Sequence, residues 1–262
     1  MATKDFGAIE TDYAFFMSHA TEAKSDVEEY ARQLNGFADG RSLIHLLDFG
    51  CGTGEFSRQL LETLAWPKGA LFLTLFEPVD HQQELAARRL SRFSEHAIAS
   101  LGEASFDKQP VFDVIISNHV LYYAESLSQT IDQLLERLHT EGKMLLAMAG
   151  HENALIKLWK VGFDLLEQPL PFYVAEDVAA LLVNHDVRVN TSPSHYQLRF
   201  PDTEENRWKI LRFLFGDYLR QIPRDALLKE FDQYVQEDHI EINTYSEHFT
   251  VELNPQTQSS AQ

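Results

Sequence analysis

Residues 43–54 read Leu-Ile-His-Leu-Leu-Asp-Phe-Gly-Cys-Gly-Thr-Gly, and this stretch decides the fold. Leu43–Phe49 is an apolar run of strand length, Gly50–Gly54 has a glycine at every second position, and Glu55–Leu64 is amphipathic. Glycines permit a sharp turn and a close approach of the backbone to a ligand, and the N–H groups at a helix start suit its negative groups. The stretch predicts a strand, a ligand-binding turn and a helix. A tight turn without a ligand is the alternative.

The same alternation of strand and helix continues along the chain. Further apolar runs and amphipathic segments, in chain order, are Ala70–Phe76, Asp80–Phe93, Phe112–Ser117, Leu127–Leu138 and Gly142–Ala149. Continuous apolar strands between helices are typical of a parallel sheet that is covered on both faces. We therefore predict an α/β fold with a doubly wound sheet. Ligands bind such sheets outside the carboxyl ends of the strands, here near Phe49, Phe76 and Ser117.

The composition restricts the class of partner. The chain has 262 residues, with 22 Lys+Arg against 40 Asp+Glu, and a formal net charge of −18 at pH 7. This excess argues against nucleic acid or an anionic membrane surface as the main partner. No apolar run approaches the roughly 20 residues of a membrane-spanning helix, and Met1–Glu10 lacks a secretory pattern. We expect a cytoplasmic protein, a monomer or weak oligomer, that acts on a small molecule.

Cysteine and histidine give no indication of a metal site. Cys51 is the single cysteine of the chain, so it cannot form an internal disulfide or a cysteine-based zinc site. The eleven histidines show no ligand spacing such as H-E-x-x-H. We therefore expect no metal.

Glu77 is the second informative residue, because it directly follows the apolar run Ala70–Phe76. An acid at the end of the second strand can bind both hydroxyls of a ribose. The glycine turn and Glu77 together predict an adenosine-containing ligand. The G-x-G-x-G spacing differs from the dinucleotide pattern G-x-G-x-x-G, which disfavours a nicotinamide cofactor.

These residues resemble a known family. Residues 46–56, LLDFGCGTGEF, and residues 75–78, LFEP, are similar to the first two motifs of class I S-adenosylmethionine-dependent methyltransferases. FDVI at 112–115 and GKMLL at 142–146 resemble later strands of that family. The resemblance implies a Rossmann-like, mostly parallel seven-stranded sheet with S-adenosylmethionine as cofactor. It assigns cofactor binding to Asp48, Gly50, Gly52, Gly54 and Glu77.

A narrower resemblance extends along most of the chain. FMSHATE at 16–22, LYY at 121–123, LWK at 158–160 and NT at 243–244 resemble stretches that follow one another in the same order in histamine N-methyltransferase. His119 departs from that pattern, because that family has a glutamine there that helps hold the imidazole of histamine. The resemblance therefore implies the reaction type rather than histamine as the substrate.

Carried over position by position, this resemblance implies a complete site. The cofactor residues it adds are Gln82, Ser105 and Asn118, and the substrate residues are Glu22, Tyr123, Trp159 and Phe213. His119 and Asn243 are the catalytic candidates, because each could orient the reacting amine or accept its proton.

We divide the chain into four parts. Residues 1–40 form an N-terminal helical lid, 41–150 the cofactor-binding core, 151–253 a substrate cap that also completes the sheet, and 254–262 a disordered tail. The leading interpretation is N-methylation of an amine, which can be cationic, or of an imidazole-bearing small molecule. An O-methyltransferase acting on a phenol or carboxylate, and an S-adenosylmethionine-binding protein without catalysis, remain as alternatives.

Overall fold

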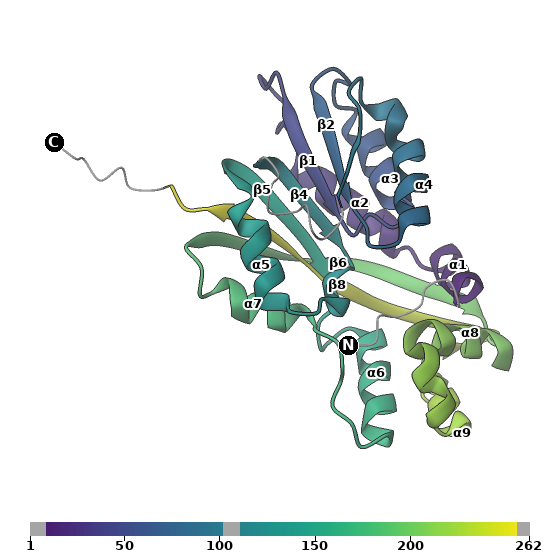
Figure 1. Ribbon diagram of the computed structural model, residues 1–262. Helices are drawn as coiled ribbons and strands as arrows, with labels where there is room; N and C mark the ends of the chain where they lie inside the picture. Colours follow the sequence, from purple (N-terminus) through teal and green to yellow (C-terminus); the bar gives the residue numbers. More distant parts are fainter. Residues whose placement is uncertain (1–8, 102–110, 256–262) are drawn as a thin grey trace.

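The computed structural model describes residues 9–101 and 111–255, and these form one mixed eight-stranded sheet (Figure 1). The strand order is β3-β2-β1-β4-β5-β8-β6, and β7 pairs with β8. The strands that run parallel to one another are β1 (Ile44–Phe49), β2 (Leu71–Phe76), β3 (Ala99–Leu101), β4 (Phe112–Asn118) and β5 (Leu138–Met148). The antiparallel strands are β6 (Val187–Pro201), β7 (Val235–Gln236) and β8 (His239–Leu253).

The predicted doubly wound, mostly parallel sheet is therefore confirmed. The described residues hold one strand more than the seven expected, because the two-residue β7 adds to the ladder. Strand β6 is 15 residues long and begins at Val187. Its first half, VRVNTSPS, is mostly polar rather than a continuous apolar run, so a search for buried strands does not reveal it.

Helices cover both faces of the sheet. One core joins β1, β2 and β4 to α2 (Glu22–Gln33), α3 (Glu55–Leu64) and α4 (Asp80–Leu90). The other core joins the opposite face to α5 (Leu127–Glu136), α6 (Ala154–Leu165) and α7 (Ala175–Leu182). The remaining helices are α1 (Glu10–His19), α8 (Glu204–Phe215), α9 (Arg224–Lys229) and the short 3₁₀ turns η1 (Ser91–Phe93), η3 (Leu121–Tyr123), η4 (Gly216–Gln221) and η5 (Asp232–Tyr234). Within the described ranges, no helix has the length and apolarity to cross a membrane.

The N-terminal segment is helical, as expected, but it breaks between α1 and α2. The break has a structural cause, because Ala20 forms an isolated bridge with Leu198 of β6 and the Thr21 N–H donates to the Gln197 carbonyl at 2.9 Å. Before the break, α1 lies against α8, where Arg212 donates two hydrogen bonds to Asp12, both at 2.9 Å. The segment is thus fixed to β6 and α8.

The packing of α6 on α8 requires a glycine. A Cβ on Gly162 would lie 2.2 Å from the ring of buried Phe215. We expect Gly162→Ala to lower the free energy of unfolding by about 1–2 kcal/mol, because the cost of overpacking, about 1–3 kcal/mol, exceeds the gain of about 1 kcal/mol in helix propensity. Urea unfolding measures this. Gly69→Ala is the control, since its Cβ would meet only the flexible end of Glu95 at 3.3 Å. Equal stabilities of the two variants would contradict the packing argument.

Candidate active site

The glycine turn after β1 adopts a backbone that only glycine accommodates easily. Gly50, Gly52 and Gly54 have φ values of +79°, +50° and +74°. A Cβ on Gly50 would lie 2.4 Å from both methyl groups of Val120, so the turn lies directly against the loop that follows β4. The N–H groups of Gly50 and Cys51 donate to the Phe76 carbonyl at 2.7 and 3.1 Å. The ends of β1, β2 and β4 therefore meet at this turn.

Glu77 and Gln82 lie at the same turn, as the sequence predicts. The half-buried Glu77 carboxylate accepts the N–H of Gly52 at 3.0 Å and that of Val79 at 3.1 Å. The Gln82 side-chain oxygen is 3.8 Å from the position that a Cβ on Gly52 would take. A carboxylate has about four lone-pair sites, so Glu77 keeps capacity for further donors.

Asp48 supports the turn from the buried side, where Ser57 Oγ donates to its carboxylate. Burial raises the pKa of the Asp48 carboxyl, the hydrogen bond from Ser57 lowers it, and the nearby charge of Glu77 raises it. Together they bring the pKa of Asp48 to about 7. Near it, at the end of β4, the buried oxygen of the Asn118 side chain accepts no hydrogen bond in the described structure. An unpaired acceptor, a carboxylate with spare capacity and a glycine cradle together fit a polar cofactor. Ser105 lies outside the described residues.

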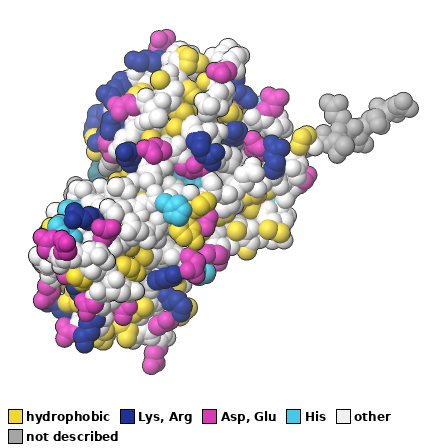
Figure 2. All heavy atoms as spheres, turned by 180° about the vertical axis from the view of Figure 1, so that it is seen from behind, with side chains coloured by type: hydrophobic (Ala, Val, Ile, Leu, Met, Phe, Trp, Pro, Cys, Tyr) yellow, Lys and Arg dark blue, Asp and Glu magenta, His cyan; other side chains and the backbone are white. Residues whose placement is uncertain are grey.

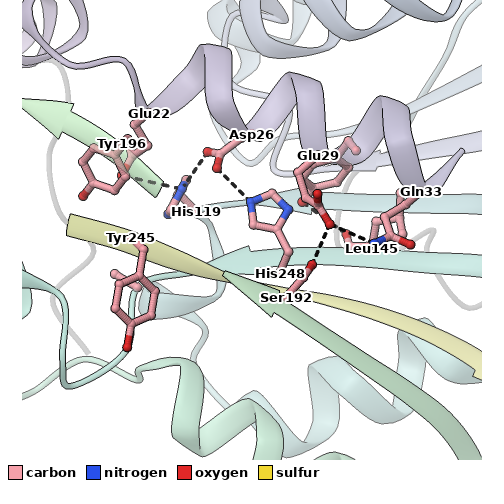
Figure 3. Close-up of polar contacts among 12 residues, drawn as sticks. Glu22, Asp26, Glu29, Gln33, His119, Leu145, Ser192, Tyr196, Tyr245 and His248 are labelled. Carbon is pink, nitrogen blue, oxygen red and sulfur yellow. Dashed lines mark hydrogen bonds and ion pairs between the residues drawn. The ribbon is translucent and has the colours of Figure 1, made fainter. Parts of the chain in front are cut away.

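Beside this cradle is a buried cluster of charged side chains centred on Asp26 of α2 (Figure 3). Asp26 is fully buried, and its two carboxylate oxygens bind different histidines. His119 Nε2 lies 3.0 Å from Oδ2, and His248 Nε2 lies 2.8 Å from Oδ1. His119 comes from the end of β4 and His248 from β8, so one carboxylate connects three distant segments.

His119 is held from both sides. Its Nδ1 is 2.9 Å from the Tyr122 hydroxyl oxygen, which also accepts the Ala149 N–H at 2.5 Å. Its backbone has φ +57°, a left-handed conformation that is uncommon outside glycine and that concentrates at functional sites. Both ring nitrogens therefore have partners in the protein.

Glu22 lies one helical turn before Asp26 and is the least neutralised member of the cluster. Its Oε1 is 3.7 Å from His119 Nε2, which is beyond hydrogen-bond distance, and the Tyr196 side chain hydrogen-bonds to it. The Tyr196 hydroxyl also accepts from Asn153 at 3.1 Å. Glu22 thus has one hydrogen-bond partner among the described side chains.

The charges in the cluster are strongly coupled. Burial lowers the pKa of His119, but the Glu22 and Asp26 carboxylates outweigh it and raise the pKa to about 9. Burial raises the pKa of Asp26, but His119 and His248 reverse this and lower it to about 2. Burial raises the pKa of Glu22, the charge of His119 lowers it, and the charge of Asp26 raises it. The net result is a pKa above the ordinary value. At neutral pH, His119 is an imidazolium paired with ionised Asp26.

Glu22, Asp26 and His119 each place one potential metal-ligand atom within 4.8 Å of the other two, which is close enough to bind a metal ion. The direct hydrogen bond between His119 and Asp26 accounts for this closeness. We therefore assign no metal to the cluster.

The other predicted substrate residues lie in aromatic packing. Trp159 is buried and donates to the Leu214 carbonyl at 2.7 Å, and its ring lies 5.8 Å from that of Tyr122. Tyr123 is half-buried, with its ring 5.3 Å from Phe172. Phe213 stacks on Phe16 of α1 at 4.6 Å. Trp159 thus reaches the cluster through Tyr122, and Phe213 holds α1.

The structure does not bring Asn243 to the cluster. Asn243 is exposed on β8, and its side-chain oxygen accepts from Gln197 at 3.2 Å. Successive side chains of a strand point to opposite faces, so Asn243 and His248 lie on different faces of β8. Asn243 instead lines an open groove of about 480 Å³ together with Thr21 and residues 195–197, 244 and 245.

Four residues of the cluster and its contacts were not among the predicted site residues: Asp26, Tyr122, Tyr196 and His248. A signal for the first was present, because Glu22, Asp26 and Glu29 recur at helical spacing on one face of α2. On the folded chain this acidic face turns inward, where Ser192 Oγ donates to Glu29 at 2.5 Å. His248 and Tyr196 lie far away in sequence, and no local pattern marks them.

Known proteins share this fold and part of this sequence. The chain matches the description "Methyltransferase domain" over residues 19–191, more than half its length, and it belongs to that family. Fold and family together place it in the class of S-adenosylmethionine-dependent methyltransferases, whose cofactor is S-adenosylmethionine.

Solved structures agree on the fold. YcgJ from Bacillus subtilis superposes with a TM-score of 0.58 at 12% identity, over 87% of this chain and all of that one. Magnesium protoporphyrin IX methyltransferase from Synechocystis PCC 6803, solved with bound S-adenosylhomocysteine, gives 0.52 at 15% identity, over 88% of this chain and 84% of that one.

The curated relatives differ in what they methylate. A malonyl-[acyl-carrier protein] O-methyltransferase of Acetivibrio thermocellus is 28% identical over 43% of this chain and 38% of its own length. Carnosine N-methyltransferase 2 of Gallus gallus is 26% identical over 55% of this chain and 51% of its own length. The matched part of the chain thus spans about half the length of these relatives or less. These relatives do not support the narrower resemblance to histamine N-methyltransferase.

The Asp26–His119 pair predicts how the stability of the fold depends on pH. The pKa of His119 is about 9 in the folded chain against an ordinary 6.5, so its stabilisation is complete below pH 6.5 and is lost as the pH rises through 9. We expect Asp26→Asn to lower that pKa by more than one unit, as measured by ¹⁵N NMR of the imidazole. The free energy of unfolding at pH 7 should fall by about 3 kcal/mol, and its decline between pH 7 and 10 should become shallower.

Glu28→Gln is the matched control, because Glu28 lies on the same helix with an exposed side chain 3.8 Å from Lys24. It should leave the His119 titration unchanged. An Asp26→Asn variant whose His119 still titrates near 9 would show that Asp26 does not hold the charge.

Proposed function

We propose that the chain transfers a methyl group from S-adenosylmethionine to a small molecule, and that the acceptor is the nitrogen of an amine or an imidazole-bearing compound. S-adenosylmethionine supplies an electrophilic methyl on a sulfonium. Gly50, Gly52, Gly54, Glu77, Gln82, Asp48 and Asn118 are the described residues that would hold it. The N-terminal helices would cover the acceptor, since α2 presents Glu22 beside the loop that contacts the glycine turn.

The observation that carries the nitrogen acceptor is the state of Glu22. Asp26 and His119 form the closer pair of opposite charges, so the half-buried Glu22 carboxylate, 3.7 Å from His119 Nε2, shares this one imidazolium with Asp26. A buried carboxylate that is incompletely neutralised favours a ligand that brings a positive charge or N–H donors. An amine or imidazolium supplies both. Carnosine, the substrate named for one relative, is an imidazole-bearing dipeptide.

O-methylation of a carboxylate is the second candidate, because another relative is a malonyl-[acyl-carrier protein] O-methyltransferase. Such an acceptor needs a free cationic donor. His119 carries the charge, but both its nitrogens are occupied by Asp26 and Tyr122. An acceptor carboxylate would also approach Glu22 and be repelled. The cluster therefore favours nitrogen.

Isothermal titration with S-adenosylmethionine and S-adenosylhomocysteine, followed by a homocysteine-release screen over amines, imidazoles, phenols and carboxylates, tests the proposal. We expect both cofactor forms to bind and turnover to occur on a nitrogen compound. Turnover confined to phenols or carboxylates would support O-methylation instead. Cofactor binding without any turnover would favour a binding protein without catalysis.

Glu77→Gln tests the cofactor assignment. The amide keeps the shape of the side chain but loses the charged acceptor that receives two backbone N–H groups, so we expect binding of S-adenosylmethionine to weaken about tenfold or more. Glu84→Gln on α4 is the control, since Glu84 is exposed and 3.8 Å from Arg88. Calorimetry should find the control unchanged, and unchanged affinity in Glu77→Gln would remove Glu77 from the cofactor site.

A further inference from the structure

We propose that Glu22 is the proton acceptor of the transfer site, and that Asp26, bound between His119 and His248, is the positioning residue that leaves Glu22 free for this task. The inference rests on the proposed function and names the step in which the acceptor nitrogen becomes reactive. Asp26 and His248 belong to no motif of the sequence. Their role follows from the hydrogen bonds that the folded chain makes.

The geometry distinguishes Glu22 from every other polar group of the cluster. His119 uses Nε2 on Asp26 and Nδ1 on Tyr122, and Asp26 uses both oxygens on histidines. Among the described residues, Glu22 accepts a hydrogen bond from Tyr196 alone, and its nearest imidazole nitrogen is 3.7 Å away. A carboxylate offers about four acceptor sites, so Glu22 can bind an N–H group without breaking a contact of the cluster.

Its location is suited to the reaction. Glu22 begins α2, and His119 beside it directly follows Asn118 and precedes Val120, the residue packed against Gly50. The cluster therefore adjoins the end of the sheet where the cofactor cradle lies. A nitrogen held by Glu22 would lie near the place from which a methyl group must come.

Several groups control the charge of Glu22. They are Asp26 on α2, His119 after β4, Tyr122 on η3, His248 on β8, Tyr196 on β6 and Tyr13 on α1. The nearby Asp26 charge and burial both favour the protonated carboxyl, and the imidazolium of His119 opposes them. The net effect is a pKa of the Glu22 carboxyl above its ordinary value, which makes the carboxylate a stronger base than an exposed glutamate.

His119 cannot take this role at neutral pH. It is already protonated beside Asp26, and an imidazolium has no lone pair to accept a proton. In the proposed step, an ammonium substrate gives a proton to Glu22, which becomes a neutral carboxyl. The freed lone pair on nitrogen then forms a bond to the methyl carbon, and the carbon–sulfur bond breaks with its electron pair going to sulfur. The product is an N-methylammonium, and Glu22 later releases its proton to solvent.

The test compares Glu22→Gln with Glu28→Gln. Glutamine keeps the hydrogen bond from Tyr196 but loses the charge and cannot accept the proton, so we expect kcat to fall about 100-fold and KM for a cationic acceptor to rise as well. The pH at half-maximal kcat should also rise, toward the pKa of the acceptor itself. Carnosine and histamine are the probes, and calorimetry with S-adenosylhomocysteine checks that the cofactor site is intact. Glu28→Gln should match the wild type throughout.

A second measurement needs no turnover. In protein labelled with ¹³C at glutamate carboxyls, one signal should titrate above the ordinary range, disappear in Glu22→Gln and persist in Glu28→Gln. A rise in KM with unchanged kcat would show that Glu22 only binds the acceptor, and a Glu22 signal in the ordinary range would overturn the proposal. Failure of the proposed function would look different, because cofactor binding or nitrogen-acceptor turnover would then be missing in the wild type.

Discussion

The site depends on one buried carboxylate. Asp26 lies in the interior and is stable there only because two imidazoles donate to its two oxygens. Those imidazoles come from the end of β4 and from β8, so the pairing fixes α2 against both halves of the sheet. Removing the carboxylate would leave His119 buried without its closest counter-charge. Electrostatics therefore fixes the first turns of α2 beside the carboxyl end of β4.

The glycine turn and the charged cluster are parts of one structure. Val120 joins them, since it follows His119 directly and would collide with any side chain at position 50. The left-handed backbone of His119 lets the chain leave β4 so that the imidazole enters the cluster while the next residue meets the turn. Cofactor geometry and acceptor geometry are thereby determined by the same few residues. A substitution in the glycine turn would therefore shift His119, and a substitution in the cluster would shift the turn.

The sequence predicts the first half of the chain well. The run Leu43–Leu64 combines strand, glycine turn and amphipathic helix in a local pattern, and the structure places Glu77 and Gln82 at that turn. The cluster is harder to predict, because Asp26, His248 and Tyr196 become neighbours only through sheet pairing and the crossing of α2. Asn243 was expected at the site, but the face of β8 that it occupies depends on a strand register that no local pattern specifies. His119 was expected at the site, but its charge could not be known before its two carboxylate neighbours were placed.

The bond between Asp26 and His248 joins residues that are 222 positions apart. Loop closure over such a distance is among the last events in folding, and a chain that emerges from the N-terminus onward cannot make this contact until β8 has been synthesised. The Gly turn, by contrast, can form once β1, β2 and β4 are present. A nascent chain would thus acquire the cradle for its cofactor, and His119 beside Asp26, long before Asp26 acquires its second imidazole. Until β8 arrives, one oxygen of the Asp26 carboxylate lacks the His248 partner that it has in the folded chain.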